Sequence, residues 1–160
     1  MRLLTLFALL ATFATAAATA AQADVTPPWG PETPNFNLEV VLRPAAGGPA
    51  DGFGLVKFRQ PNDADKIIYL DTWVRDLLPG HSYVLERAVD TNVDGACTGT
   101  GWLSLGTIQT DLSGTGRAAL SRSVAMLPIG MTFDIHFRVV DAATQAVALE
   151  SGCYQFAVSQ

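Results

Sequence analysis

Residues 131–141 read MTFDIHFRVVD and alternate apolar and polar side chains more clearly than any other part of the chain. The apolar phase of this alternation holds Phe133, Ile135, Phe137 and Val139. The polar phase holds Thr132, Asp134, His136 and Arg138. Because successive side chains of a β-strand point to opposite faces, this period of two predicts a strand with one face in a core and one face toward solvent.

Segments of the same kind lie on both sides of this strand. They are expected at residues 35–42, 53–60, 66–76, 81–89, 102–110, 117–125, 145–150 and 153–158. Pro, Gly, Asn and Asp gather between the segments, so turn signals recur about every 8–12 residues. Eight or nine short strands with this spacing predict an all-β fold, an antiparallel Greek-key sandwich or barrel.

The longest turn-rich interruption lies at residues 90–101 and reads DTNVDGACTGTG. It contains Cys97, and the only other cysteine, Cys153, lies close to the C-terminus. Two cysteines in an exported chain predict one disulfide. A pair of free thiols or a metal-binding pair is the alternative, although no CxxC or Cys–His spacing favours a metal.

Residues 1–23 have the pattern of a secretory signal peptide, with a short charged start, an apolar run and a small-x-small site (AQA) at its end. We expect cleavage after Ala23, a proline-rich extended leader at residues 24–34 and a single domain at residues 35–160. No later stretch reaches the roughly 20 apolar residues that a membrane-spanning helix requires. The protein is therefore expected to be secreted or periplasmic, with an uncleaved N-terminal membrane anchor as the alternative.

The charge of the chain limits its partners. The formal net charge is −5 at pH 7, and Lys and Arg form no run. Because phosphate binding requires clustered cationic side chains, a nucleic acid is excluded as the expected partner. A cell surface, a carbohydrate or another protein remains open as the partner.

The loop also contains a partial calcium-binding pattern. Asp90, Asn92 and Asp94, with Gly95 after them, fit the first half of a calcium loop, D-x-N-x-D-G. The twelfth position, where a bidentate glutamate is needed, is Gly101. Because Asp, Asn and Gly are also ordinary turn residues, the sequence predicts no cofactor, and a structural calcium ion is the alternative.

No catalytic constellation stands out in the chain. His81 and His136 are the only histidines, and two histidines cannot build a three- or four-histidine metal site without carboxylates. There is no G-x-S-x-G nucleophile motif, and the carboxylates are dispersed. A metal or acid–base site that combines His81 and His136 is the enzymatic alternative.

The strand at residues 66–76 offers a candidate ligand surface. Tyr69, Asp71 and Trp73 would share one of its faces. Aromatic rings with a polar edge suit a wet binding surface, so this face is the preferred ligand site if it is exposed. The alternative is that Trp73 belongs to the core of a strand covered on both faces.

Several short motifs follow one another in a characteristic order. They are GLVKFRQ at residues 54–60, LPGH at 78–81, the loop with Cys97, LGTIQTD at 105–111 followed by Gly114 and Gly116, IHFRVVD at 135–141, and SGC at 151–153. This order resembles the Cu/Zn superoxide dismutases over about residues 53–158. The resemblance implies a Greek-key β-barrel with one disulfide from a long loop to the last strand.

The chain departs from that family at the metal ligands. The family binds copper and zinc through several histidines and an aspartate, and its HxH copper pair should follow the Pro-Gly turn. Here that strand begins HSY at residues 81–83, so His81 alone is available, and His136 could match one further ligand. The resemblance therefore implies the fold and the disulfide without dismutase activity. A generic immunoglobulin-like or fibronectin-like module accounts for LPG at residues 78–80 followed by Tyr83 as well.

The sequence thus predicts a secreted, non-catalytic β-sandwich that serves as a binding or structural module. One alternative is a divergent metalloenzyme or hydrolase, which requires His81 and His136 to converge. The other is a calcium-stabilised adhesive or carbohydrate-binding domain, which requires calcium to raise the melting temperature through Asp90 and Asp94.

Overall fold

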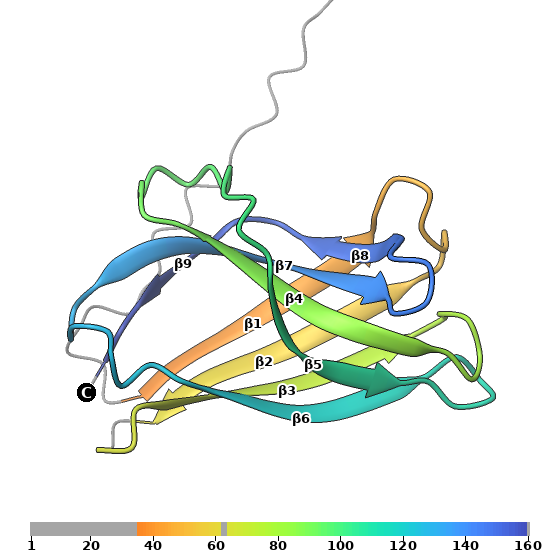
Figure 1. Cartoon of the computed structure of the whole chain (residues 1–160), viewed down its shortest axis with the longest axis horizontal. Helices are drawn as coiled ribbons and strands as arrows, with labels where there is room; N and C mark the ends of the chain where they lie inside the picture. Colours follow the sequence, from red (N-terminus) through yellow and green to blue (C-terminus); the bar gives the residue numbers. More distant parts are fainter. Residues whose placement is uncertain (1–34, 62–63, 160) are drawn as a thin grey trace, which may run out of the picture.

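A computed structural model describes residues 35–61 and 64–159 of the chain. This part is all β, with nine antiparallel strands and no helix, which confirms the predicted fold class (Figure 1). The predicted signal peptide and proline-rich leader, residues 1–34, lie outside the described residues. Within the described part, no helix is long and apolar enough to cross a membrane.

The strands begin and end close to the predicted positions. They are β1 (Asn35–Pro44), β2 (Phe53–Pro61), β3 (Ile67–Arg75), β4 (Ser82–Asp90), β5 (Leu103–Gln109), β6 (Gly116–Ser123), β7 (Thr132–Asp141), β8 (Val147–Ser151) and β9 (Tyr154–Ala157). The period of two explains why these segments are strands. In β3, for example, Ile68, Leu70, Thr72 and Val74 are all buried on one face.

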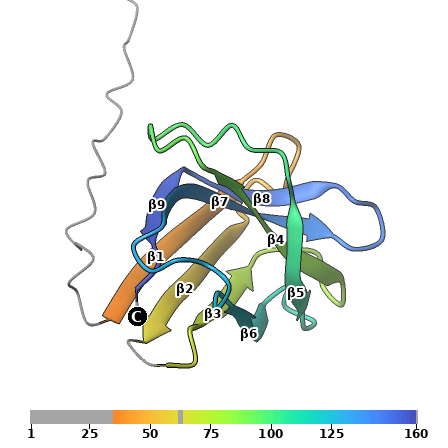
Figure 2. The same ribbon diagram turned by 60° about the vertical axis from the view of Figure 1, so that its left-hand side comes forward.

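The strands form one sheet that curls into a nearly closed barrel. Hydrogen-bonded neighbours follow the order β5-β4-β7-β8-β1-β2-β3-β6, and β9 also pairs with β7. Because β5 contacts β6, four consecutive strands have the spatial order β7-β4-β5-β6, which is a Greek key. Figure 2 shows β1, β2 and β3 on one side of the barrel and β4, β7 and β8 on the other.

Aromatic side chains fill much of the core. The ring of Phe58 packs edge-on against Phe137 and Phe156. Tyr83 is buried, and its hydroxyl oxygen accepts a 3.1 Å hydrogen bond from the Leu78 N–H, similar to the tyrosine corner of Greek-key sandwiches. Burial raises the pKa of Tyr83, and the bond from Leu78 partly opposes this rise.

The barrel closes weakly between β5 and β6. Near the hairpin that joins them, a backbone bridge links Thr110 and Gly116. Leu120 of β6 packs directly over Gly106 of β5, where an added Cβ would lie 2.5 Å from the Leu120 Cδ2 atom. Away from the hairpin the two strands diverge (Figure 1). We call this boundary between β5 and β6 the seam.

Candidate functional site

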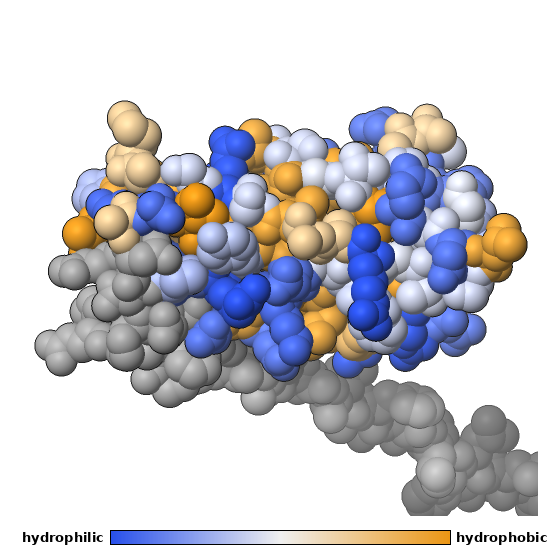
Figure 3. All heavy atoms as spheres, turned by 90° about the horizontal axis from the view of Figure 1, so that it is seen from below, coloured by the Kyte–Doolittle hydropathy of each residue, from blue (hydrophilic) through white to orange (hydrophobic). Residues whose placement is uncertain are grey.

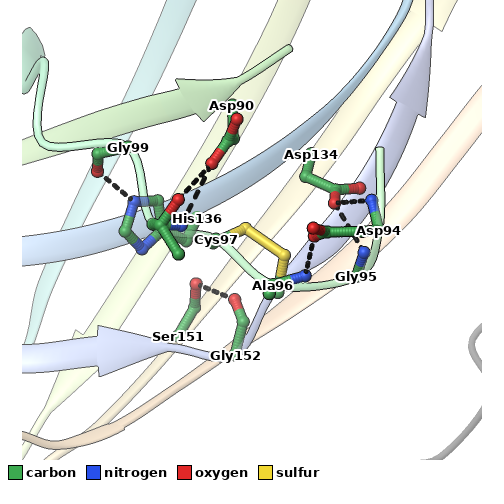
Figure 4. Close-up of a disulfide and its surroundings, with 12 residues drawn as sticks. Asp90, Asp94, Gly95, Ala96, Cys97, Gly99, Asp134, His136, Ser151 and Gly152 are labelled. Carbon is green, nitrogen blue, oxygen red and sulfur yellow. Dashed lines mark hydrogen bonds between the residues drawn. A yellow bond between two sulfur atoms is a disulfide. The ribbon is translucent and has the colours of Figure 1, made fainter. Parts of the chain in front are cut away.

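The long loop at residues 91–102 is fastened to the end of the chain. Cys97 and Cys153 form a disulfide with their Cα atoms 5.3 Å apart, which confirms the predicted pairing (Figure 4). Cys153 lies between β8 and β9, directly before the last strand. The disulfide therefore holds the loop against the C-terminal segment, beside the outer face of β7.

The loop covers the polar face of β7, which the alternation predicted to face solvent. Asp134 on this face is only 1% exposed. Its carboxylate accepts hydrogen bonds from the N–H groups of Asp94, at 3.0 Å, and Gly95, at 2.7 Å (Figure 4). Asp134 therefore anchors the loop, and the expectation of a solvent-exposed polar face is wrong at this position.

The predicted calcium ligands accept hydrogen bonds within their own loop. The Asp90 carboxylate accepts bonds from the Asn92 N–H and from the Thr98 hydroxyl, and the Asp94 carboxylate accepts one from the Ala96 N–H. The bonds from Thr98 and Asn92 lower the pKa of Asp90. Among the described residues no group of three or more His, Cys, Asp or Glu is arranged to hold a metal ion. The bonds from the Asn92 N–H to Asp90 and from the Ala96 N–H to Asp94 are those of ordinary Asx turns.

The two histidines lie far apart along the β4–β7 pair. His136 pairs in register with Ala88, whereas His81 precedes β4, so the rise per residue of a strand separates them by roughly 20 Å. His136 is half-buried, because its Nε2 contacts the Gly99 carbonyl oxygen at 3.0 Å and its ring lies 4.5 Å from that of Trp102. His81 and His136 therefore form no shared site, and the enzymatic alternative lacks the convergence that it requires.

His81 contributes instead to a turn at the opposite end of β7. The buried carboxylate of Asp141 accepts hydrogen bonds from the N–H groups of Thr144, at 2.8 Å, and Ala143, at 3.0 Å. Nδ1 of His81 lies 3.1 Å from the same carboxylate. The bond from Thr144, followed by that from His81, lowers the pKa of Asp141 to about 2.

We expect Asp141→Asn to make the protein less sensitive to acid. The folded-state pKa of Asp141 lies below its ordinary value of 3.8, so the carboxylate stabilises the fold above about pH 4. That stabilisation is lost as the pH falls from about 4 to about 2. Melting temperatures measured between pH 7 and pH 2 should therefore fall less steeply for the variant than for the wild type. His81→Asn should have a smaller effect because the backbone donors remain, and parallel profiles for Asp141→Asn and wild type would contradict this assignment.

The predicted ligand surface lies on the outside of the barrel. Tyr69, Asp71 and Trp73 share the outer face of β3, as expected from the alternation. Tyr69 is 37% exposed, Asp71 forms a 2.7 Å ion pair with Arg59, and Trp73 is half-buried against the edge of Phe53. Trp73 is therefore not part of the core.

A shallow groove on this face is lined by Lys57, Asp71, Trp73 and Arg117. Figure 3 shows the underside of the barrel, where hydrophilic side chains are interspersed with hydrophobic ones.

A different and more enclosed site lies inside the barrel. Where β5 and β6 diverge, a half-open cavity of about 280 Å³ extends toward the core. Its walls are largely apolar and include Phe58, Leu70, Leu105, Ile135, Phe137 and Phe156. Polar groups come from Arg87, Arg122 and Ser123. We call this space the seam cavity.

The two arginines of the seam cavity occupy inward-facing positions. Arg87 follows Tyr83 and Leu85 on the inner face of β4 and is half-buried. Arg122 follows Leu120 on the inner face of β6 and lies at the exposed end of that strand. Burial lowers the pKa of Arg87, and the nearby charge of Arg122 lowers it further. Among the described residues neither guanidinium has a carboxylate within ion-pair distance.

Neither arginine is among the candidates expected from the sequence. The alternation of β4 could have identified Arg87, because Arg87 occupies the same inward-facing phase as Tyr83 and Leu85. The phase of β6 is harder to read because its inward positions hold the small side chains of Gly116 and Ala118. An arginine in an inward phase predicts either a buried ion pair or the edge of a cavity.

Comparison with protein-family models, with curated proteins and with solved structures finds no match for this chain. The disulfide, the loop carboxylates and the two histidines all contact other groups of the fold. The seam cavity and its two arginines are therefore the features from which a function can be inferred.

Proposed function

We propose that this protein is an exported, non-catalytic β-barrel that binds a small apolar or amphiphilic molecule in the seam cavity. The observation that supports this function is the cavity itself, which has aromatic and aliphatic walls and opens to solvent on one side. Ligand sites in proteins are typically concave, mostly apolar and furnished with a few polar groups. The volume of about 280 Å³ lies near the lower end of such sites and indicates a small ligand.

The packing of ordinary cores also supports a binding role. Protein interiors are close-packed and contain few voids larger than a water molecule. A space of about 280 Å³ next to Phe137 and Phe156 sacrifices contacts that a closed barrel would make. Met126 at the rim is 95% exposed, so the entrance itself offers apolar surface to an incoming molecule.

The remaining parts of the proposal concern compartment and layout. A disulfide is typical of an oxidising compartment, which supports export. The barrel and the disulfide from the long loop support a layout like that of Cu/Zn superoxide dismutases, without the metal site. The bond between Tyr83 and Leu78 supports the immunoglobulin-like alternative equally well.

Octan-1-ol provides a test of the seam cavity as a binding site. We expect the wild type to bind it with one-to-one stoichiometry in calorimetry. Leu105→Trp should weaken this binding by about tenfold or more, corresponding to ~1.4 kcal/mol, because the larger side chain fills part of the cavity.

Leu55→Trp is the matched control, since Leu55 is also a half-buried leucine but lines the outer groove near Trp73. Binding that is absent in the wild type would contradict the proposal. Binding that Leu55→Trp weakens and Leu105→Trp leaves intact would instead locate the ligand on the outer face of β3.

A further inference from the structure

We infer that the ligand of the seam cavity is an anionic amphiphile, a medium-chain carboxylate whose head group lies between the guanidinium groups of Arg87 and Arg122. This inference rests on the proposed function of the cavity and adds the chemical class of its ligand. It follows from the position, the charge and the surroundings of the two arginines.

The two arginines approach the cavity from opposite sides of the seam. Arg87 of β4 pairs in register with Phe137 of β7 and with Leu103 of β5. Arg122 of β6 pairs in register with Ile68 of β3. Since β5 and β6 diverge here, the side chains of Arg87 and Arg122 reach the same opening from two strands that do not pair with each other.

Within residues 35–61 and 64–159, neither arginine of this opening takes part in an ion pair. The ion pairs of the described residues involve other cationic groups, namely Arg59, Arg75, His81 and Arg138. Arg122 is exposed, but Arg87 is half-buried beside apolar walls, where a cationic group is ordinarily matched by a carboxylate. An anion bound between Arg87 and Arg122 would supply a negative charge to both and relieve the repulsion between them.

The geometry of a guanidinium favours a carboxylate as that anion. Its planar donors match the two oxygens of a carboxylate, and such charge-assisted bonds strengthen where water is partly excluded. The rest of the cavity is apolar, so the remainder of the ligand must be hydrocarbon. A cavity of about 150 Å³ takes up benzene, so this larger one has room for a chain of about ten carbon atoms.

The competing explanation is that the two arginines only shield apolar surface from water. Long cationic side chains often lay their alkyl stems over apolar surface and keep the charged end in water. In that case Arg87 and Arg122 would shield Leu105 and Phe137 without binding anything. Shielding of this kind gives no preference for an anionic ligand over a neutral ligand of the same length.

Octanoate and octan-1-ol separate these explanations because they share a chain length and differ in charge. We expect the wild type to bind octanoate about tenfold or more tightly than octan-1-ol, the scale of hydrogen bonds to charged groups. In the double variant Arg87→Met, Arg122→Met this preference should disappear, while octan-1-ol binding is kept or improved. Inorganic phosphate alone should bind at least tenfold more weakly than octanoate, since it lacks the chain.

Arg117→Met is the matched control, because Arg117 belongs to the same strand as Arg122 but lies on the outer face. The double variant should melt at the same temperature as the wild type or higher, since it loses a repulsion between like charges. Equal binding of octanoate and octan-1-ol, or a preference that survives in the double variant, would overturn the inference and leave the proposed function standing. Failure of both ligands to bind the wild type would overturn the proposed function itself.

Discussion

The double variant Cys97→Ser, Cys153→Ser is expected to be about 4 kcal/mol less stable toward unfolding than the wild type. The disulfide joins residues 56 positions apart, so its removal frees a long loop in the unfolded chain. In the chain-entropy model that freedom favours the unfolded state by about 4 kcal/mol. Since single domains typically have 5–15 kcal/mol of stability, the loss is a large fraction of the total.

Urea unfolding of the oxidised wild type, the reduced wild type and the double-serine variant would measure this effect. The reduced wild type and the variant should share one midpoint, well below that of the oxidised protein. Val93→Ser changes an exposed residue of the same loop and should stay within about 0.5 kcal/mol of the wild type. A loss below about 1 kcal/mol on removing both cysteines would show that the disulfide fastens the loop alone and not the folded domain.

Asp134→Ala is expected to lower the free energy of unfolding by about 3 kcal/mol. Its carboxylate is buried beneath the loop and accepts hydrogen bonds from the N–H groups of Asp94 and Gly95. Alanine leaves both donors without this acceptor, and each bond to a charged group contributes roughly 1.5–3 kcal/mol. Part of the loss is recovered when the released loop is hydrated.

The substitution Asp134→Asn keeps a hydrogen-bond acceptor at this position and removes the negative charge. Its amide oxygen can still accept from Gly95, so we expect roughly half of the alanine loss. Asp51→Ala, at an exposed aspartate of the β1–β2 loop, is the control and should change stability by less than about 0.5 kcal/mol. Urea unfolding gives the free energies, and faster exchange of the Gly95 amide would locate the change. An alanine variant as stable as the wild type would refute the anchoring role of Asp134.

The effects of the disulfide and of Asp134 should not add. Both act on the loop at residues 91–102, and effects on neighbouring residues that share a structure are coupled. Once the disulfide is removed, the loop detaches more easily, so the hydrogen bonds to Asp134 contribute less to the free energy of unfolding. The triple variant should therefore lose less stability than the sum of its parts.

The strands were predictable because the alternation reports burial directly. On β7, for example, the residues that face the core of the barrel are those that the spacing indicates, namely Phe133, Ile135, Phe137 and Val139. The same alternation cannot tell what covers the other face. Asp134 and His136 of β7 lie under a loop that is distant in sequence, and nothing in their own strand marks that contact.

The candidate sites were less predictable for two physical reasons. Asp, Asn and Gly form both calcium loops and Asx turns, so the pattern at Asp90 and Asp94 fits either structure. The significance of Arg87 and Arg122 depends on strand order. These inward arginines line an opening because β5 and β6 stand at the two ends of the strand order, and that order is a property of the whole sheet.

The open seam also makes β5 and β6 edge strands of the sheet. Edge strands present unpaired N–H and C=O groups that can recruit a strand from a second molecule and start aggregation. Two features near the seam oppose such pairing. Arg122 places a charge on the edge strand β6, and a register shift after Leu85 makes the pairing of β4 with the other edge strand, β5, irregular. The gap that admits a ligand therefore also needs protection against other chains, and the Arg122 charge that we assign to ligand binding provides part of that protection.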